Sequence, residues 1–400
     1  MGKEQIRKDV LLVTNVWTGA APFFYEGQEK SKGMPAFNNV FYKILDDDRI
    51  GTIHVIVWQP EYVISIPPKY NKKIQIYTVG ERSTNLFQKF KLIYTAVSLG
   101  VRIVQNNSNI QQLVGFGSLG GVTALISRKT SVPEFRRLYG TFLINEISEP
   151  KWKLFLKHPL EYLTFSMKGK GLIITNDGTK GDIVFEKIGN KDLPLHFLLN
   201  GVDKNIATNI KRPKNISLPD NFMTYVARLD PWKSQHLLIE ALHCIHTKGL
   251  DFPVTYIIGA AWDKEYVARL SMMVNKFGLE DKIKFIYGLP IQEVHYMLLH
   301  SDITFSLYHT SNLGNVFIEA VQLGVPMIAL NDTGSLDLID LNAFFEIKSN
   351  KIEVIEDAIL NLLENDELRH QISENAKKFA NRTFLSWEER AKREIDLIIE

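Results

Sequence analysis

One carboxylate, Glu319, stands alone in the apolar stretch SNLGNVFIEAVQLGVPMIAL, residues 311–330. A buried acid needs a partner. A ligand that offers two hydroxyl groups would satisfy it, and so would a nearby arginine or lysine. Ahead of it, Gly314 allows backbone to approach a ligand closely, and Asn315 is a suitable N-cap for a helix. We therefore expect Glu319 about one turn into a helix, near the positive helix end.

Two cations, Arg228 and Lys233, follow a buried apolar run in YVARLDPWKSQHLLIEAL, residues 225–242. The pattern predicts a strand that runs into Arg228, a polar loop with a proline, and then an amphipathic helix. Ligands of open α/β sheets bind at the carboxyl ends of strands, and a helix N-terminus favours anions. Arginine adds a two-pronged donor that fits phosphate. The pattern indicates a phosphate site, and a solvated loop with incidental cations is the alternative.

Strand and helix patterns alternate twice along the chain, on either side of a polar region at about 203–221. Near-continuous apolar strands are typical of parallel sheets that are covered on both faces. We therefore expect two doubly wound α/β domains. The predicted strands are VLLVT, TIHVIVW, VRIVQ and GLIIT in the first half, and MTYVARL, VTYIIGA, KIKFIYG, ITFSLY and PMIAL in the second.

The composition is that of an ordinary globular protein, with 400 residues of which 45% are hydrophobic and 23% charged. No apolar run approaches the roughly 18 residues that a membrane span needs. The N-terminus reads better as a first buried strand than as a signal peptide. A single cysteine, Cys244, excludes an internal disulfide framework and fits a reducing compartment. We therefore expect a cytoplasmic protein.

Charge is spread unevenly along the chain. Residues 1–200 hold 26 Lys and Arg against 17 Asp and Glu, a balance of +9, whereas residues 201–400 hold 21 against 28, a balance of −7. The division suggests two domains with different partners, although chance variation of the surface would also produce it. We expect no nucleic acid among these partners.

Two further patterns have structural interpretations. GFGSLGG, residues 115–121, contains GxGxxG, but ten residues separate Gly115 from Val104 in the predicted strand VRIVQ, and no acid lies near position 140. We interpret its glycines as sites of close helix packing. Three histidines at positions 236, 243 and 246 share a predicted helix but form no standard metal spacing with Cys244. We therefore predict no metal site.

In order and spacing, these motifs resemble the family-4 glycosyltransferases, whose GT-B architecture has two Rossmann-like domains that face each other across a cleft. The resemblance covers most of the chain and is strongest in its second half. The similar segments are LLNGVD at 198–203, VARLDPWKSQHLLIEA at 226–241, IIGAAWDKEY at 257–266, IKFIYGLPIQEV at 283–294, GNVFIEAVQLGVPMIAL at 314–330 and FLSWEERA at 384–391.

The resemblance implies transfer of a sugar, with retention at the anomeric carbon, from a nucleotide diphosphate sugar to a hydroxyl group, without a metal or other cofactor. A UDP-sugar is the expected donor, and the acceptor is a glycan, a lipid-linked sugar, a small metabolite or a protein. The implied domains are an acceptor-side domain at 1–202, a nucleotide-sugar domain at 203–383 and a crossover helix at 384–400 that returns to the first domain.

The resemblance also implies roles for single residues. Arg228 and Lys233 would bind the diphosphate and stabilise its charge as it leaves, and Glu319 would accept hydrogen bonds from the ribose hydroxyls. Gly33 lies in KGMPAFNN, similar to a family glycine loop whose second glycine is Met34 here. The donor nucleotide would lie near Gly33, Gly259, Gly288, Leu289, Gly314, Asn315, Val316 and Glu319.

Two positions on the sugar side depart from the family pattern. The family has a second glutamate eight positions before Glu319, where this chain has Ser311, and a histidine where Tyr139 stands in RRLYGTF. The implied residues around the donor sugar and acceptor are Tyr139, Thr310, Ser311 and Asn312. The two departures leave alternatives: a catalytically weak sugar-nucleotide-binding subunit of a partner enzyme, or a sugar-nucleotide epimerase of the same fold.

KWKLFLKHPLEYLTFSMKGK, residues 151–170, carries five lysines against one acid, with aromatic residues between them. Its apolar residues recur at roughly helical spacing. One interpretation is a peripheral contact with anionic lipid at the inner face of the membrane, toward a lipid-linked acceptor. The other is a core helix with a solvated lysine face.

Overall fold

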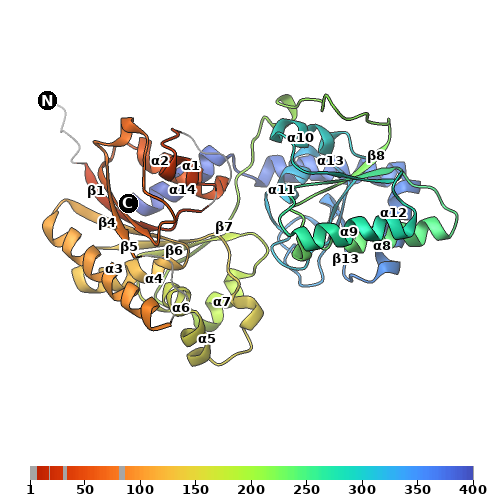
Figure 1. Cartoon of the computed structure of the whole chain (residues 1–400). Coiled ribbons are helices and arrows are strands. Elements are labelled where there is room, and N and C mark those ends of the chain that lie inside the picture. The colour runs from red at the N-terminus through yellow and green to blue at the C-terminus, as the bar shows by residue number, and fades with distance from the viewer. Residues whose placement is uncertain (1–6, 18, 30–33, 81–85, 400) are drawn as a thin grey trace. The chain divides into compact units, whose positions relative to one another are not determined.

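The computed structural model describes residues 7–17, 19–29, 34–80 and 86–399, which form two compact units (Figure 1). The first unit holds the described residues up to Asn176, residues 180–201 and the chain from Trp387 onward. The second holds Asp177–Thr179 and Val202–Ser386. Gly33 lies outside the described residues.

The described part of the first unit forms a seven-stranded parallel sheet in the order β3-β2-β1-β4-β5-β6-β7. Its strands are β1 (Lys8–Thr14), β2 (Ile50–Trp58), β3 (Ile74–Val79), β4 (Ile110–Phe116), β5 (Glu134–Leu138), β6 (Gly171–Asn176) and β7 (Leu195–Leu199). Its helices are α1 (Ala21–Tyr25), α2 (Pro35–Asp46), α3 (Leu86–Asn106), α4 (Gly120–Thr130), α5 (Lys151–Lys157), α6 (Pro159–Ser166), α7 (Gly181–Ile188) and the C-terminal α14 (Trp387–Ile399).

Both faces of this sheet are buried, because helices cover each of them. Along β1, Val10 and Leu12 pack with residues of α2 and α14, whereas Leu11 and Val13 pack with residues of α3 and α4. Successive strand residues point to opposite faces, so a strand that is covered on both sides favours apolar residues at consecutive positions. This explains the continuous run VLLVT.

The described part of the second unit forms a six-stranded parallel sheet in the order β10-β9-β8-β11-β12-β13. Its strands are β8 (Phe222–Val226), β9 (Val254–Ile258), β10 (Ile283–Ile286), β11 (Ile303–Ser306), β12 (Met327–Leu330) and β13 (Phe345–Ile347). Its helices are α8 (Gln235–Thr247), α9 (Lys264–Phe277), α10 (Ile291–Leu299), α11 (Asn315–Leu323), α12 (Ile352–Glu364) and α13 (Asp366–Thr383).

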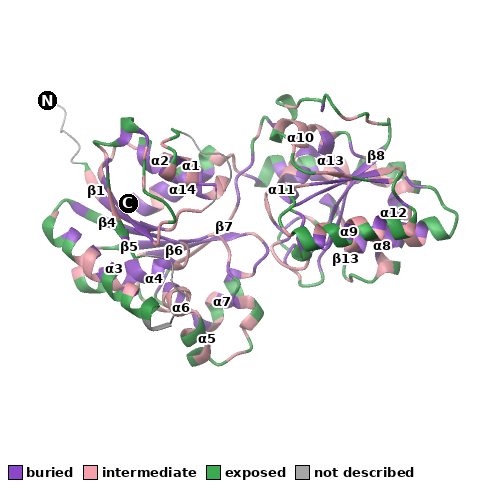
Figure 2. Ribbon diagram, in the orientation of Figure 1, coloured by how far each residue is buried: buried purple, intermediate pink, exposed green. Residues whose placement is uncertain are grey.

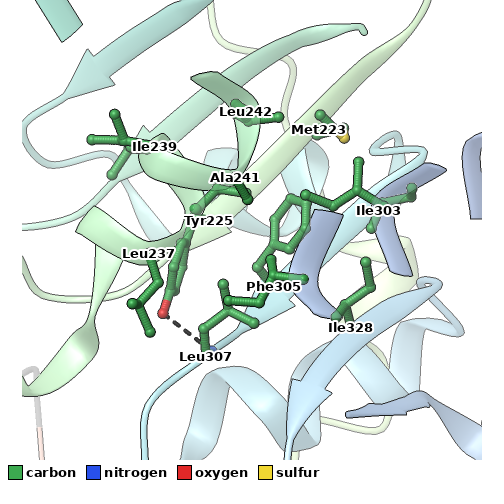
Figure 3. Close-up of a cluster of buried hydrophobic side chains, with 14 of the residues drawn as sticks. Met223, Tyr225, Leu237, Ile239, Ala241, Leu242, Ile303, Phe305, Leu307 and Ile328 are labelled. Carbon is green, nitrogen blue, oxygen red and sulfur yellow. Dashed lines mark hydrogen bonds between the residues drawn. The ribbon is translucent and has the colours of Figure 1, made fainter. Parts of the chain in front are cut away.

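Helices α8, α9 and α12 lie on one face of the second sheet, and α10, α11 and α13 lie on the other (Figure 1). Figure 2 shows buried strands between helices whose outer faces are exposed. Part of the core appears in Figure 3, where Tyr225 and Phe305, from β8 and β11, pack near Leu242 of α8. The expectation of two doubly wound parallel-sheet domains is therefore confirmed.

The C-terminal helix α14 packs on the first unit. Ile395 and Ile398 join the same hydrophobic cluster as Leu12 of β1. Glu394 is fully buried, lies 3.0 Å from the guanidinium of Arg137 and also pairs with Arg390. A buried acid between two arginines therefore anchors this helix.

The predicted strand VRIVQ is wrong, because residues 101–105 belong to α3. Ile103 and Val104 are buried against the sheet, and a short apolar run of this kind fits either element. The strand is β4, and GFGSLGG begins with the last two residues of that strand. The packing interpretation of its glycines has support, since a Cβ on Gly115 would lie 2.6 Å from the Cα of Gly120, and one on Gly121 would lie 2.4 Å from the Leu160 carbonyl oxygen.

Residues 151–170 contain two short helices, α5 and α6, which meet at His158. Leu154 and Phe165 are buried, whereas Trp152 and Leu156 are exposed. Among the described helices of the chain, none is long and apolar enough to cross a membrane.

Candidate functional site

The candidate site lies where the second sheet reverses its winding direction. Strands β8 and β11 are neighbours, and from them the chain winds toward β10 on one side and toward β13 on the other. Ligands of open α/β sheets bind outside the carboxyl ends of the strands at this switch point. The loops that follow β8 and β11 carry Arg228, Lys233 and Ser311. The Lys233 ammonium, 3.5 Å from the backbone carbonyl oxygen of Ser311, joins the two loops.

Arg228 is held in position by its neighbours, although its side chain is 46% exposed. Its Nε donates to Asp230 at 2.6 Å, and its guanidinium carbon lies 4.9 Å from the centre of the Trp262 ring. Asp230 is buried and also accepts the Trp232 backbone N–H at 3.0 Å. Because the bond to Asp230 uses Nε, the two terminal nitrogens of Arg228 can still form a fork with phosphate.

Lys233 is a partly buried cation. Its ammonium lies 3.7 Å from the centre of the Tyr308 ring. The pKa of Lys233 is lowered to about 8: burial lowers it most and Arg228 contributes to the decrease, whereas the carboxylates of Asp230 and Asp177 oppose it. A desolvated ammonium group gains strongly from an anionic ligand, since such a ligand restores the interactions that burial removes. The geometry of Lys233 therefore suits a phosphate group.

Tyr225 ties the two loops to the sheet. It is fully buried on β8, and its hydroxyl donates to the backbone carbonyl of Lys233. The same hydroxyl accepts the backbone N–H of Leu307 at 3.2 Å, the bond drawn in Figure 3. Sequence reasoning missed this role, because nothing in the run MTYV separates a linking tyrosine from an ordinary core residue.

Helix α11 begins at Asn315, so the expectation that Asn315 is its N-cap is wrong. The N-cap is Gly314, which has extended backbone angles and no side-chain cap. A Cβ on Gly314 would meet only the Ser311 carbonyl oxygen, at 3.7 Å. The N–H groups of a first helical turn have no acceptor inside the helix, and a helix end without a side-chain cap suits an anion.

Glu319 has a protein partner of a type that the sequence did not indicate. Its Oε2 lies 3.4 Å from the Nε2 of His295, which comes from α10. The side chain of Glu319 is 18% exposed and that of His295 is 8% exposed. The expected partners were a ligand, an arginine or a lysine, and the observed histidine still leaves part of the carboxylate accessible.

Three of the residues expected around the donor sugar, Thr310, Ser311 and Asn312, lie in the loop after β11 of the second unit. Asn312 is fully buried; its amide donates to Leu330 at 3.0 Å and accepts the Ser335 hydroxyl at 2.7 Å. It therefore holds its own loop, and the expectation that it contacts a sugar is not supported by its position. Ser311 and Thr310 are both partly exposed in the same loop.

Tyr139 belongs to the first unit, where its ring packs edge-on against Trp17 at 5.3 Å between ring centres. The guanidinium carbon of Arg137 lies 4.2 Å from the ring centre of Tyr139. Burial raises the pKa of Tyr139 well above its usual value, so it is a neutral aromatic residue at this position.

Two residues of the predicted nucleotide site, Gly259 and Gly288, require glycine for different structural reasons. A Cβ on Gly259 would lie 1.8 Å from the carbonyl oxygen of Ala227, so the close approach of two strand ends requires glycine there. Gly288 has a φ of 92° and open space around its Cα. With the partly exposed Leu289, it forms a turn whose backbone groups can reach a ligand.

The first unit has a cavity of about 290 Å³ at the carboxyl ends of β1 and β2. It is lined by Asn15, Val16, Trp17, Trp58, Gln59 and Glu61. Aromatic faces beside amide and carboxylate groups can bind a ligand that has both apolar surface and hydroxyl groups.

The family match found by comparison with known proteins lies within the second unit. Residues 207–379 match the family Glycosyl transferases group 1. An uncharacterized glycosyltransferase of Methanocaldococcus jannaschii is 24% identical over 264 residues, 64% of this chain and 64% of that protein. D-inositol 3-phosphate glycosyltransferase of Corynebacterium glutamicum is 27% identical over 180 residues, 44% of this chain and 43% of that enzyme. The chain thus spans less than two thirds of either relative.

Among solved structures, Anabaena HepE in complex with UDP and glucose aligns with 98% of this chain and 100% of its own, with a TM-score of 0.68 and 16% identity. At this identity the likeness shows the fold alone. It confirms the GT-B fold class that the sequence indicated, with a Rossmann-like sheet in each unit.

Proposed function

We propose that the protein is a retaining, metal-independent glycosyltransferase that moves a sugar from a nucleotide diphosphate sugar to a hydroxyl group of an acceptor. The observation that carries the proposal is the position of Arg228 and Lys233. Both cations lie at the switch point of the second sheet, inside the segment that matches the group 1 family. Diphosphate is the ligand chemistry that this position suits best.

Arg228, Lys233 and the first turn of α11 bind the two phosphates in this proposal. When the bond between sugar and phosphate breaks, negative charge grows on the leaving diphosphate. Positive groups already held in place stabilise that charge without reorganisation. The bonds to Asp230 and from Tyr225 provide this preorganisation for the two cations. A metal ion is then not needed to neutralise the phosphates.

Glu319 accepts hydrogen bonds from the two ribose hydroxyls, since a carboxylate has two oxygens and accepts from both. The Nε2 of His295, from α10, lies 3.4 Å from this carboxylate. The turn at Gly288 and Leu289 meets the base through backbone groups, and Gly259, Gly314, Asn315 and Val316 complete the nucleotide site.

A UDP-sugar is the proposed donor. Support comes from HepE, whose structures were solved with UDP and with UDP-glucose. The first unit provides the acceptor side, with the cavity between Trp17 and Trp58 as the proposed position of a glycan or another hydroxyl-bearing acceptor.

A peripheral contact with anionic membrane through residues 151–170 belongs to the same proposal. Exposed Trp152 and Leu156 support it. Lys153 and Lys157 pair with Glu149 and Glu146, which reduces the positive charge offered to lipid.

One observation favours a second candidate, a weakly active sugar-nucleotide-binding subunit. Position 311 holds a neutral serine instead of a carboxylate, which weakens the contact that residue 311 itself can make with a sugar. The epimerase alternative has no observation of its own in the structure.

Nucleotide-sugar hydrolysis and transfer, screened with UDP-, GDP- and ADP-sugars in excess EDTA, test the proposal. We expect turnover of one donor class in EDTA, with the α-anomer as the first product of an α-linked donor when read by NMR. Loss of activity in EDTA with recovery on Mn²⁺ would contradict metal independence. Binding without turnover of any donor would favour the subunit instead.

A further inference from the structure

The segment Asp177–Thr179 follows β6 in the chain but belongs by its contacts to the second unit. Its backbone is tied to the loop after β11, because the Leu313 N–H donates to the Asp177 carbonyl at 3.1 Å. Gly178, with a φ of 90°, packs so closely that a Cβ would lie 2.3 Å from the Asn312 side-chain oxygen. Asp177 is therefore held beside Ser311.

The carboxylate of Asp177 is bound unevenly. Its Oδ1 accepts the Thr179 N–H at 3.1 Å and the Thr179 hydroxyl at 2.6 Å, and its Oδ2 accepts the Ser311 hydroxyl at 3.2 Å. Each carboxylate oxygen accepts about two hydrogen bonds. Oδ1 is thus filled, whereas Oδ2 accepts the Ser311 hydroxyl and has the capacity for a second hydrogen bond.

Asp177 Oδ2 is bonded to Ser311, a residue of the candidate site. Ser311 also offers its backbone carbonyl to Lys233, at 3.5 Å, and the Asp177 charge acts on Lys233. Asp177 is therefore linked through Ser311 to the cation that binds phosphate in the proposed function. A sugar joined to that phosphate would have its hydroxyl groups within reach of a carboxylate in this place.

We propose that Asp177 is a specificity-determining residue for the donor sugar, whose Oδ2 accepts a hydrogen bond from a sugar hydroxyl. The inference rests on the proposed function. Ser311 positions the carboxylate through its own hydroxyl group. Asp177, 134 positions earlier in the chain, thereby supplies the carboxylate that residue 311 itself lacks.

This arrangement changes what a glutamate at 311 would do. From the sequence alone, Ser311→Glu should alter only the preference for the sugar. With Asp177 in place, the new carboxylate would share a small space with an existing one, and two such charges repel. Ser311→Glu should therefore weaken sugar recognition, and adding Asp177→Ser should restore part of it.

Calorimetric titration with UDP-glucose, UDP-N-acetylglucosamine and GDP-mannose, beside UDP and GDP alone, tests the inference. The variant Asp177→Asn keeps the shape, can still accept both Thr179 bonds and loses the charge. We expect it to weaken the best-bound nucleotide sugar about tenfold, since charge-assisted bonds are roughly twice as strong as neutral ones. Affinity for the free diphosphate should change less than about twofold. Asp182→Asn, an exposed aspartate on α7, is the matched control.

The outcomes separate the two proposals. If Asp177→Asn weakens the free diphosphate as much as the nucleotide sugar, Asp177 only supports Lys233 and the inference is wrong. Unchanged affinity for every ligand, or no recovery in Ser311→Glu/Asp177→Ser, would also overturn it. If the wild-type protein binds neither the nucleotide sugars nor the free diphosphates, the proposed function fails first and the inference fails with it.

Discussion

The ammonium group of Lys233 and the backbone carbonyl oxygen of Ser311 lie 3.5 Å apart, between residues separated by 78 positions. Their contact joins the loops after β8 and β11 across the centre of the second sheet. A group that neutralises phosphate therefore sits next to a loop that faces the sugar in the proposed function.

Removing either cation should abolish most of the activity. Arg228→Ala and Lys233→Ala should each lower turnover by about 10²-fold or more, the scale of losing one preorganised charge contact. Both residues lie in a loop, so folding should survive, as circular dichroism would check. Lys276→Ala, at an exposed position of α9, is the control. Unchanged turnover in both site variants would remove the basis of the phosphate assignment.

The affinity for free UDP should depend on pH through Lys233. Burial lowers the pKa of Lys233 to about 8, so below pH 8 the ammonium group is charged before the ligand binds. Above pH 8 binding must first take up a proton, and affinity should fall by up to about tenfold per pH unit. Calorimetry at pH 9 in two buffers of different ionisation enthalpy measures that proton. UDP binding should be accompanied by no proton uptake in Lys233→Met, whereas Arg228→Ala should keep the proton uptake. If the wild-type protein takes up no proton when UDP binds at pH 9, the prediction is wrong.

Tyr225→Phe should separate positioning from folding. The variant leaves the buried Leu307 N–H and the Lys233 carbonyl without their partner, which should cost about 1–3 kcal/mol of unfolding free energy. Because Lys233 loses its support, turnover should also fall by about tenfold. Tyr256→Phe removes a hydroxyl that donates to Ser217 at 3.1 Å and should cost stability only. Equal turnover in the two variants would show that Tyr225 has no positioning role.

Glu319→Ala should weaken the free nucleotide. The loss should be about 1–3 kcal/mol, the scale of hydrogen bonds to a charged group. Titration with free UDP or GDP measures it, beside Glu353→Ala, which removes an exposed acid in the first turn of α12. A full loss of sugar specificity with intact affinity for the nucleotide would place Glu319 on the sugar side instead.

Glu394→Ala should destabilise the first unit without changing nucleotide binding by the second unit. It leaves Arg137 and Arg390 buried next to each other with no acid between them. Breaking a buried ion pair on one side costs about 3–5 kcal/mol. Chemical denaturation measures the loss, and Glu388→Ala, an exposed acid of the same helix, should change stability little. The affinity of the folded variant for free UDP should equal that of the wild type.

Much of the second unit follows from local sequence. Runs such as ITFSLY and PMIAL are mostly apolar because helices cover both faces of their sheet, and this pattern can be recognised without knowledge of distant residues. Arg228 and Lys233 follow one such run directly, so their place at a strand end was predictable. The run VRIVQ shows where local sequence is insufficient. A short apolar run fits a strand or a helix, and here it forms the buried face of α3.

The sequence by itself determined the fold class and the position of the two cations, because both depend on residues that are close in the chain. Only the tertiary structure decided which groups meet. Tyr225 reaches Leu307, His295 reaches Glu319, and Asp177 reaches Ser311. Tyr225 and Leu307 meet because β8 and β11 are neighbours in the sheet, and the other two pairs join a helix or a loop to another one. No spacing along the chain encodes the distance between these side chains. The motif around Ser311 therefore gives no sign of the Asp177 carboxylate, which only the folded chain brings next to it.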